Sequence, residues 1–328
     1  MRPLPPFLLG LAALAGACAN AGDEGAAPAH WQSEWPETDF SRAAIDFDEI
    51  SEGGPPRDGI PSIDAPRFGA PGEDYPLALG PNEPVISLAL GGEARGYPLR
   101  ILTRHEIVND DVGGVPVAVT YCPLCDSAVV FDRRLDGRVL EFGTTGKLRH
   151  SDLVMYDRQT ESWWQQFLGL AIVGELKGSE LEMLPSRVES LARFRARFPD
   201  GRLLLPPGPA GIYDNPYVRY DSRDRPYPFF KGEMPEGIAP MARVVAVGGK
   251  AWTLRGLAEA GRIEADGLVL SWHEGMNSAL DSRDIARGRD IGNVVVQRRG
   301  ENGLEDVPYD VTFAFAFHAF HPEGEIVD

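Results

Sequence analysis

Two segments of the chain place soft metal ligands at matching positions. The first, VAVTYCPLCDSA, carries Cys122 and Cys125, and the second, LVLSWHEGMNSA, carries His273 and Met276. When the segments are aligned, the two thiols correspond to the imidazole and the thioether. Thiolate, imidazole and thioether groups together favour copper, and copper(I) above all. We therefore expect Cys122, Cys125, His273 and Met276 to bind one soft metal ion, copper being the first choice.

An internal duplication would explain how the two segments meet. Each follows a short apolar run that reaches two glycines, one charged residue and an alanine: ISLALGGEA, beginning at Ile86, and RVVAVGGKA, beginning at Arg243. Such a run predicts a β-hairpin, because glycines accept the positive φ of a tight turn. A repeated unit of this kind predicts two related β-rich halves, at about 84–200 and 201–328, with the metal ion between them.

The body of the chain is expected to have an α+β fold dominated by strands. Alternating and β-branched stretches such as Val115–Tyr121 and Val294–Gln297 predict strands, and Phe313–Phe317 reads as a buried strand with His318 at its end. Helices are expected within Leu99–Asn109 and over Glu189–Phe198. The strands and helices do not alternate in the manner of a βαβ protein, which excludes a doubly wound parallel sheet.

The N-terminus has the features of a secretory signal. Arg2 precedes an apolar stretch that is too short to be a permanent membrane span, and small residues lead into Cys18. This pattern resembles the bacterial lipobox, in which the cysteine is lipidated and becomes the first residue of the mature protein. Residues 1–18 are therefore expected to be a signal peptide, with Cys18 as the lipidation site.

The residues that follow define the expected localisation. Ala19-Asn20, directly after Cys18, lacks the aspartate that would retain a lipoprotein at the inner membrane, so the pattern indicates the outer membrane, facing the periplasm. Residues 19–50 are expected to form a flexible tether, and residues 51–328 a single globular domain. The alternative is ordinary cleavage after Ala19-Asn20-Ala21, which would release a soluble periplasmic protein.

Composition limits the range of partners. The chain of 328 residues contains 49 acidic and 32 basic residues, a net charge of −17. A surface this acidic argues against nucleic acid and anionic lipid as partners, because both require basic patches. The expected partners are the membrane, reached through the lipid anchor, and a metal ion or small molecule, while nothing in the sequence identifies a protein partner.

A second interpretation makes the protein a cell-envelope enzyme. The segment from Phe142 to Gln165 mixes polar and aromatic residues in the way that walls of a cleft do. Here His105, His150 and Asp152 would be catalytic, Trp163 and Trp164 would line the cleft, and the two cysteines would form a structural disulfide. A third interpretation is a metal-free binding or scaffold module. A thioredoxin-type activity is disfavoured, because the sequence after the cysteines predicts a strand rather than a helix.

Several short motifs resemble one known family. They are, in chain order, Asp58-Gly-Ile-Pro61, Ala94-Arg-Gly-Tyr-Pro98, His105-Glu-Ile-Val-Asn-Asp110, Tyr121-Cys-Pro-Leu-Cys125 and Ser151-Asp-Leu-Val-Met-Tyr-Asp-Arg158. Together they resemble the bacterial domain-of-unknown-function family 3179, from about residue 50 to the Phe-His-Pro near the C-terminus. The resemblance brings no activity with it, so the function has to be argued from the residues.

Overall fold

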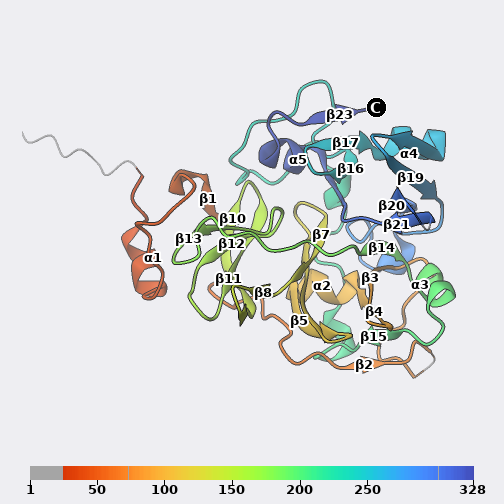
Figure 1. Cartoon of the computed structure of the whole chain (residues 1–328), viewed down its shortest axis with the longest axis horizontal. Helices are drawn as coiled ribbons and strands as arrows, with labels where there is room; N and C mark the ends of the chain where they lie inside the picture. The colour runs from red at the N-terminus through yellow and green to blue at the C-terminus, as the bar shows by residue number, and fades with distance from the viewer. Residues whose placement is uncertain (1–24, 73, 302) are drawn as a thin grey trace, which may run out of the picture.

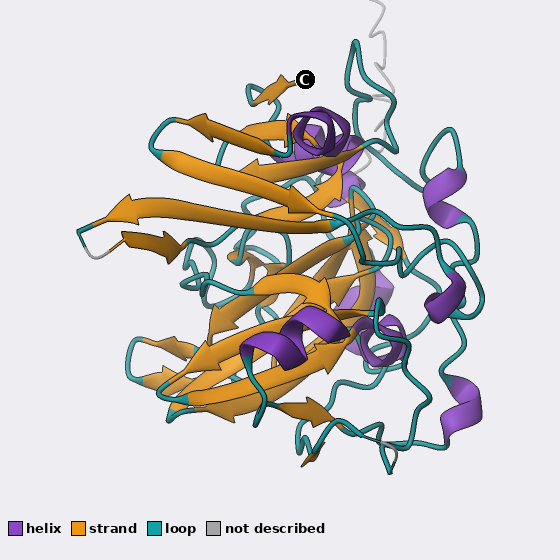
Figure 2. Ribbon diagram, turned by 90° about the vertical axis from the view of Figure 1, so that its right-hand side faces the viewer, coloured by secondary structure: helices purple, strands orange, loops and turns teal. Residues whose placement is uncertain are grey.

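The computed structural model describes residues 25–72, 74–301 and 303–328. Strands make up 38% and helices 15% of the structure, which confirms the predicted strand-dominated α+β fold. In the described part of the chain the strands form five sheets of three to five strands, and one small hairpin of β8 (Arg134–Leu135) and β9 (Arg138–Val139). The five sheets lie in a ring that resembles a β-propeller (Figure 1, Figure 2).

Two of these sheets have the same topology. The strands of the first are, in order across the sheet, β14 (Arg187–Ser190), β3 (Pro84–Leu90), β4 (Glu93–Pro98), β15 (Arg202–Leu204) and β2 (Phe68–Gly69). The strands of the second are β22 (Asp310–Phe313), β16 (Arg243–Val247), β17 (Lys250–Thr253) and β23 (Glu325–Val327). In both, the second and third strands form an antiparallel hairpin, the first strand pairs antiparallel with it, and the fourth pairs parallel.

The connections between these sheets and their neighbours also correspond. Each hairpin is followed by a helix, either α2 (Leu99–His105) or α4 (Leu254–Ala260). Each helix leads into an antiparallel sheet, either β5 (Ile107–Val112), β6 (Val115–Cys122) and β7 (Ser127–Asp132), or β18 (Arg262–Ala265), β19 (Leu268–His273), β20 (Asn293–Gly300) and β21 (Gly303–Asp306). A second helix, α3 (Leu191–Arg197) or α5 (Ala314–Phe320), then connects the two strands that flank each hairpin, β14 to β15 or β22 to β23.

The glycine pairs singled out in the sequence form the turns of the two hairpins. Gly91 has a φ of 54° and Gly248 a φ of 57°, the left-handed conformation that glycine adopts without steric cost. At Gly91 there is also no room for a side chain, since a Cβ there would lie 2.6 Å from the carbonyl oxygen of Gly113. Both hairpins are therefore as expected, while the internal duplication stays a prediction.

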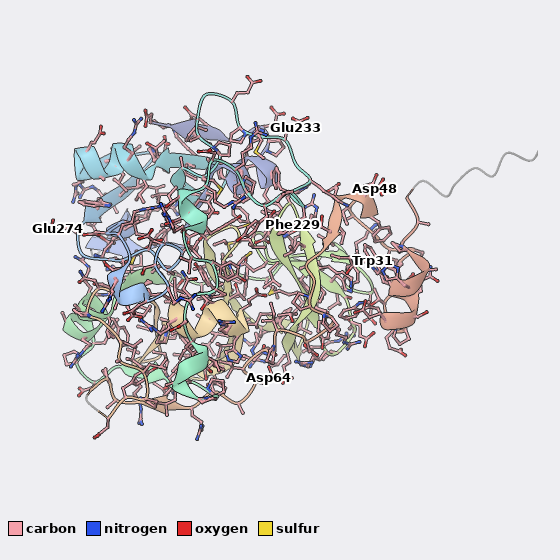
Figure 3. The ribbon with its side chains drawn as sticks, turned by 180° about the vertical axis from the view of Figure 1, so that it is seen from behind. Trp31, Asp48, Asp64, Phe229, Glu233 and Glu274 are labelled. Carbon is pink, nitrogen blue, oxygen red and sulfur yellow. The ribbon has the colours of Figure 1, made fainter. Side chains whose placement is uncertain are left out.

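The fifth sheet carries the N-terminal segment. Its strands are β1 (Ile50–Glu52), β10 (Phe142–Arg149), β11 (Asp152–Asp157), β12 (Trp163–Gln165) and β13 (Leu170–Val173). Before β1 come α1 (Ala29–Glu34) and a short 3₁₀ helix, η1 (Phe47–Glu49), and the aromatic side chains of this segment pack on the sheet (Figure 3). Trp35 is fully buried, with its ring 4.8 Å from that of Tyr156 and 5.5 Å from that of Trp163.

This packing corrects the predicted tether. From Ala29 onward the chain is part of the folded body. Trp31, Trp35 and Phe47 are buried against the fifth sheet, and removing their apolar surface from water stabilises the docked segment. The Ala, Gly and Pro content of the segment predicted flexibility, but the aromatic residues decide the outcome. Cys18 and the signal peptide lie outside the described residues.

The C-terminal aromatic run also differs from its prediction. Residues 314–320 form helix α5 and not a strand, and Phe315, Phe317 and Phe320 are buried on two sides of it. A helix that is apolar on more than one face is typical of a buried position. The strand was predicted because Phe313, Phe315 and Phe317 are spaced two residues apart, which is also the period of a strand. In the described part of the chain, no helix combines the length and apolar character of a membrane span. The remaining short 3₁₀ helices are η2 (Ala210–Ile212), η3 (Tyr220–Ser222) and η4 (Ile285–Arg287).

Candidate metal centre

Cys122, Cys125 and Asp152 meet at a buried position in the protein. One ligand atom of each, the two Sγ atoms and a carboxylate oxygen, lies within 4.8 Å of the other two. Both cysteines carry free thiols, and their exposed fractions are 1% and 0%. Asp152 is fully buried as well. Two soft ligands and one hard ligand are therefore enclosed at a single point.

Local structure explains how these side chains come together. Cys122 ends β6 and Cys125 lies in the tight connection to β7, so the two cysteines lie on the same short turn. Asp152 begins β11 directly after the turn from β10, whose two central residues, His150 and Ser151, have φ values of 50° and 65°. Positive φ at both central positions is typical of a type I′ hairpin turn, which glycine and asparagine usually occupy. The turn presents the Ser151 carbonyl to the Cys122 thiol, which donates to it at 3.6 Å.

Unusual backbone conformations gather around this point. Of the nine non-glycine residues with positive φ among the described residues, four flank the cluster: Glu106, Asp126, His150 and Ser151. Such conformations cost on the order of 1–3 kcal/mol each and persist where the surrounding structure enforces them, often at functional sites. Strain at four positions around one cluster supports a function for the cluster.

The hydrogen bonds of Asp152 leave one oxygen atom free. Its Oδ2 accepts from the Gln165 side-chain amide and from the Phe167 backbone N–H, the latter at 3.0 Å. Its Oδ1 is buried and accepts no hydrogen bond from the described residues, and the same is true of the Gln165 Oε1. A buried acceptor without a partner is costly, so these oxygens require a donor or a cation.

Burial shifts every acid of the cluster toward its neutral form. It raises the pKa of Asp152 to about 7 and raises that of the Cys122 thiol, while the pKa of Cys125 lies well above its usual range. Two neighbouring carboxyl groups behave alike: burial, aided by the charge of Asp152, raises the pKa of Glu106 to about 8, and burial raises that of Asp310 to about 6. Without an ion, both thiols are therefore protonated at neutral pH and the Asp152 carboxyl is about half protonated, so a bound cation would have to displace these protons.

A third sheet is linked to the cluster through backbone. The Cys125 carbonyl accepts from the Thr312 hydroxyl at 2.7 Å and from the Phe313 N–H at 3.1 Å, both at the end of β22. Asp310, at the start of β22, accepts from the Ala128 N–H at 3.0 Å. Elements of three sheets, β6–β7, β10–β11 and β22, thus converge here.

The other two predicted metal ligands lie elsewhere. His273 ends β19, where it pairs with Asn293 in the sheet, and it is exposed. Met276 is buried and lines a small cavity together with Tyr121 and Asp126. Neither belongs to the group formed by the cysteines, whose third member is Asp152.

The residues predicted to be catalytic are distributed over different surroundings. Both ring nitrogens of His105 have partners, Nδ1 with the Pro61 carbonyl at 2.8 Å and Nε2 with the Tyr213 hydroxyl at 3.2 Å. His150 Nδ1 lies 2.6 Å from the Lys231 carbonyl oxygen and its Nε2 3.2 Å from Glu49. Burial lowers the pKa of both histidines. Asp152 alone of the three lies in the cysteine cluster.

The predicted cleft wall is part of the core. Trp163 and Trp164 are both fully buried, and the Trp164 Nε1–H donates to Asp157 at 2.8 Å. Trp163 packs against Trp31 and Phe40 of the N-terminal segment. These rings stabilise the fifth sheet and do not line an open cleft.

Two acidic residues near the cluster were missed as site residues. Glu106 directly follows α2, and its φ of 58° ends the helix. Asp310 was not singled out, since an isolated acidic residue far along the chain carries no local signal. In the sequence, Asp152 and the cysteines have one feature in common: both lie in motifs that carry the family resemblance, residues 151–158 and 121–125. That was the only signal that could have linked them.

Comparison with known proteins gives one match. The model of the family described as "Protein of unknown function (DUF3179)" matches residues 57–324. The search of curated proteins and the search of solved structures each returned no match.

Proposed function

Since the chain belongs to this family of unknown function, we propose from its site alone that the protein is a metalloprotein, with Cys122, Cys125 and Asp152 as ligands of one transition-metal ion. The observation that carries the proposal is the approach of the three ligand atoms to within 4.8 Å in a fully buried position. The unpartnered Asp152 Oδ1 supports it, because a cation would supply the missing partner.

The ligand types favour zinc over copper. Zinc accepts both cysteine thiolates and aspartate oxygens as ligands, whereas copper(I) prefers sulfur ligands. The expectation of copper depended on Met276 and His273, and neither is in the group of three. Copper(I) held by the two thiolates is the alternative, and elemental analysis separates the two metals.

The enclosure of the site separates the proposed ion from substrate, although the three protein ligands leave one position of a tetrahedral zinc ion unfilled. Catalytic zinc sites keep a position open to substrate, while structural sites are closed. The cysteines here are at most 1% exposed, and an ion bound to them would connect the β6–β7 turn to the start of β11. Dithiol–disulfide exchange is disfavoured by the same burial, because the attacking thiolate of such enzymes is accessible and has a lowered pKa.

Metal analysis of ligand variants tests the proposal. Protein purified from its own cell envelope without added metal should contain about one zinc ion per chain, and its two buried thiols should react only after the metal is removed. Cys122→Ser and Asp152→Asn should each reduce the metal content to a small fraction of the wild-type value. Asp111→Asn, at an exposed position of β5, is the matched control and should retain full metal content.

The result that would overturn the proposal is equally clear. A folded wild-type protein that contains no metal, and that gains no thermal stability from added zinc or copper(I), would show that the cluster does not bind these ions. Circular dichroism of each variant establishes that loss of metal is not a consequence of misfolding.

We also propose that the protein is exported and anchored by lipid at Cys18. The support is the signal-like N-terminus, in which small residues precede the cysteine. The Cys18→Ala variant should lose the mass of the lipid and move from the membrane fraction to the soluble fraction, or remain unprocessed. Processing at an unmodified site in the wild-type protein would instead indicate a soluble periplasmic protein.

A further inference from the structure

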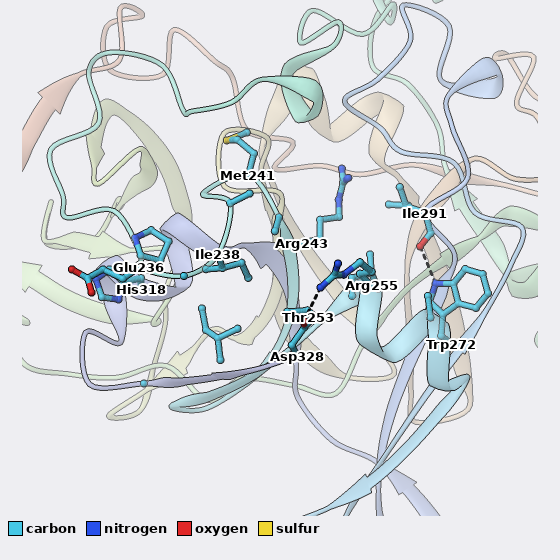
Figure 4. A pocket seen from close by; sticks show the side chains of 18 of the residues that line it. Glu236, Ile238, Met241, Arg243, Thr253, Arg255, Trp272, Ile291, His318 and Asp328 are labelled. Carbon is cyan, nitrogen blue, oxygen red and sulfur yellow. Dashed lines mark hydrogen bonds and ion pairs between the residues drawn. The ribbon is translucent and has the colours of Figure 1, made fainter.

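A cavity of about 1000 Å³ lies on the second hairpin sheet, and none of the three cluster residues lines it. Its walls are the loop that leads into β16, the start of α4, the segment around Ile291 and the turn before β23 (Figure 4). The volume is that of a site for a small organic molecule. Neither the proposed metal centre nor any of the predicted site residues explains it.

Much of the wall is apolar. Ile238 and Met241 come from the loop before β16, Leu254 from α4, and Trp272 and Ile291 from the opposite side. The indole of Trp272 is held in place, because its Nε1–H donates to the Ile291 carbonyl at 3.0 Å. A ring fixed in this way gives a ligand a flat apolar surface without loss of side-chain freedom.

Three arginines contribute the polar part: Arg243, Arg255 and Arg289. Arg243 is the most enclosed, with a side chain that is 6% exposed and that is fixed by Asp126 and Asp221. Its Nε and Nη2 make these contacts, whereas its Nη1 donates to none of the described residues. Among the residues that the structure describes, Arg255, at 72% exposure, is paired with Asp328 alone.

Two of the three acidic residues that line the cavity, Asp290 and Asp328, are already used by the protein, and the third, Glu236, is exposed. Asp290 accepts from the backbone N–H groups of Gly275, Met276 and Gly292. Asp328 accepts from the Thr253 hydroxyl and from Arg255. Glu236 is thus the one acidic side chain of the cavity wall without a partner among the described residues, whereas Arg243 and Arg255 each keep guanidinium nitrogens that donate to none of them.

From this arrangement we infer that the cavity is a binding site for a small organic anion with a flat apolar body. The apolar walls take up the body, and the guanidinium groups of Arg243 and Arg255 take up the anionic group, for which their planar fork is suited. A cation of the same shape would be repelled by these two guanidinium groups and could pair only with Glu236, at an exposed position of the wall.

Calorimetric titration with two matched probes tests the inference. The full mature chain should bind 2-naphthoate saturably at one site and should bind 2-naphthylmethylammonium at least about tenfold more weakly. Ala258→Trp places a bulky ring in the cavity from a half-exposed position of α4 and should weaken naphthoate binding by about tenfold or more. Arg255→Glu should weaken it severalfold through charge repulsion.

Matched variants outside the cavity serve as controls. Ala260→Trp lies on the same helix, and Arg298→Glu makes the same charge change at an exposed position of β20, so neither should alter binding. Equal affinity for the two probes, no saturable binding of naphthoate, or equal weakening by Ala258→Trp and Ala260→Trp would each overturn the inference.

Discussion

Asp152 is the residue at which the metal-free and the metal-bound centre would differ most. Without a metal ion it is buried with one oxygen unpartnered, and its pKa is raised to about 7. With an ion bound, the same oxygen would gain a partner of opposite charge and the carboxylate form would be stabilised. The side chain therefore links metal binding to pH and to folding.

This linkage predicts a pH dependence of the metal-free protein. Asp152 has an ordinary pKa of 3.8 and a folded pKa of about 7, so between these values the folded state holds a proton that the unfolded chain has lost. The stability from this group is fully present below pH 3.8 and is lost as pH rises through about 7. At about 1.4 kcal/mol per pKa unit, Asp152 alone contributes on the order of a few kcal/mol.

Urea unfolding in the presence of a chelator measures this effect. The fall in the free energy of unfolding between pH 5 and pH 8 should be smaller for Asp152→Asn than for the wild type, because asparagine does not titrate. Saturating zinc should reduce the fall in the wild type only. Identical pH profiles of the wild type and the variant would show that Asp152 does not carry the linkage.

At this scale the sequence predicted part of the centre. Cys122 and Cys125 were identified because two cysteines separated by two residues can reach one ion, a property of local spacing. Asp152 was noticed but assigned to catalysis, because only the packing of β11 beside the β6–β7 turn brings it to the cysteines. The choice of His273 and Met276 depended on an alignment of the two halves, which says nothing about how closely the aligned turns approach.

At the scale of elements, apolar side chains decide which segments join the body. The N-terminal segment shows this, since its composition predicted a tether while Trp31, Trp35 and Phe47 dock it on the fifth sheet. The hairpins and the strand-rich character were predictable from alternation and from the glycine pairs. The docking was not, because a few aromatic residues in a polar segment have no periodicity to read.

The docking predicts a large effect of one aromatic residue. Trp35→Ala should lower the free energy of unfolding by about 3–5 kcal/mol, because Trp35 is fully buried between Arg57, Tyr156 and Trp163. Ile212→Ala, at a side chain that is 47% exposed, should change it by less than about 0.5 kcal/mol. Urea unfolding of both variants checks this. An effect of Trp35→Ala as small as that of Ile212→Ala would mean that the N-terminal segment is a flexible tether after all.

At the scale of the whole molecule, the centre lies where separate parts of the ring meet. Its ligands come from the β6–β7 turn and from β11, and the Cys125 carbonyl accepts hydrogen bonds from the end of β22. The β6–β7 turn, β11 and β22 belong to three different sheets. An ion bound here would therefore join parts of the ring that are not paired in one sheet. Metal sites of this kind add their binding free energy to the stability of the fold.

Hydrogen exchange can show whether the ion acts on all three sheets together. Removing the metal should speed amide exchange in β6, β11 and β22 by similar factors, because these strands would lose one shared support. Strands β18 and β19, which contribute no ligand, should change little. In Cys122→Ser the chelator should have no effect on any of these strands. Faster exchange confined to the β6–β7 turn would mean that the ion stabilises only its own loop, and the ring would then be held by packing alone.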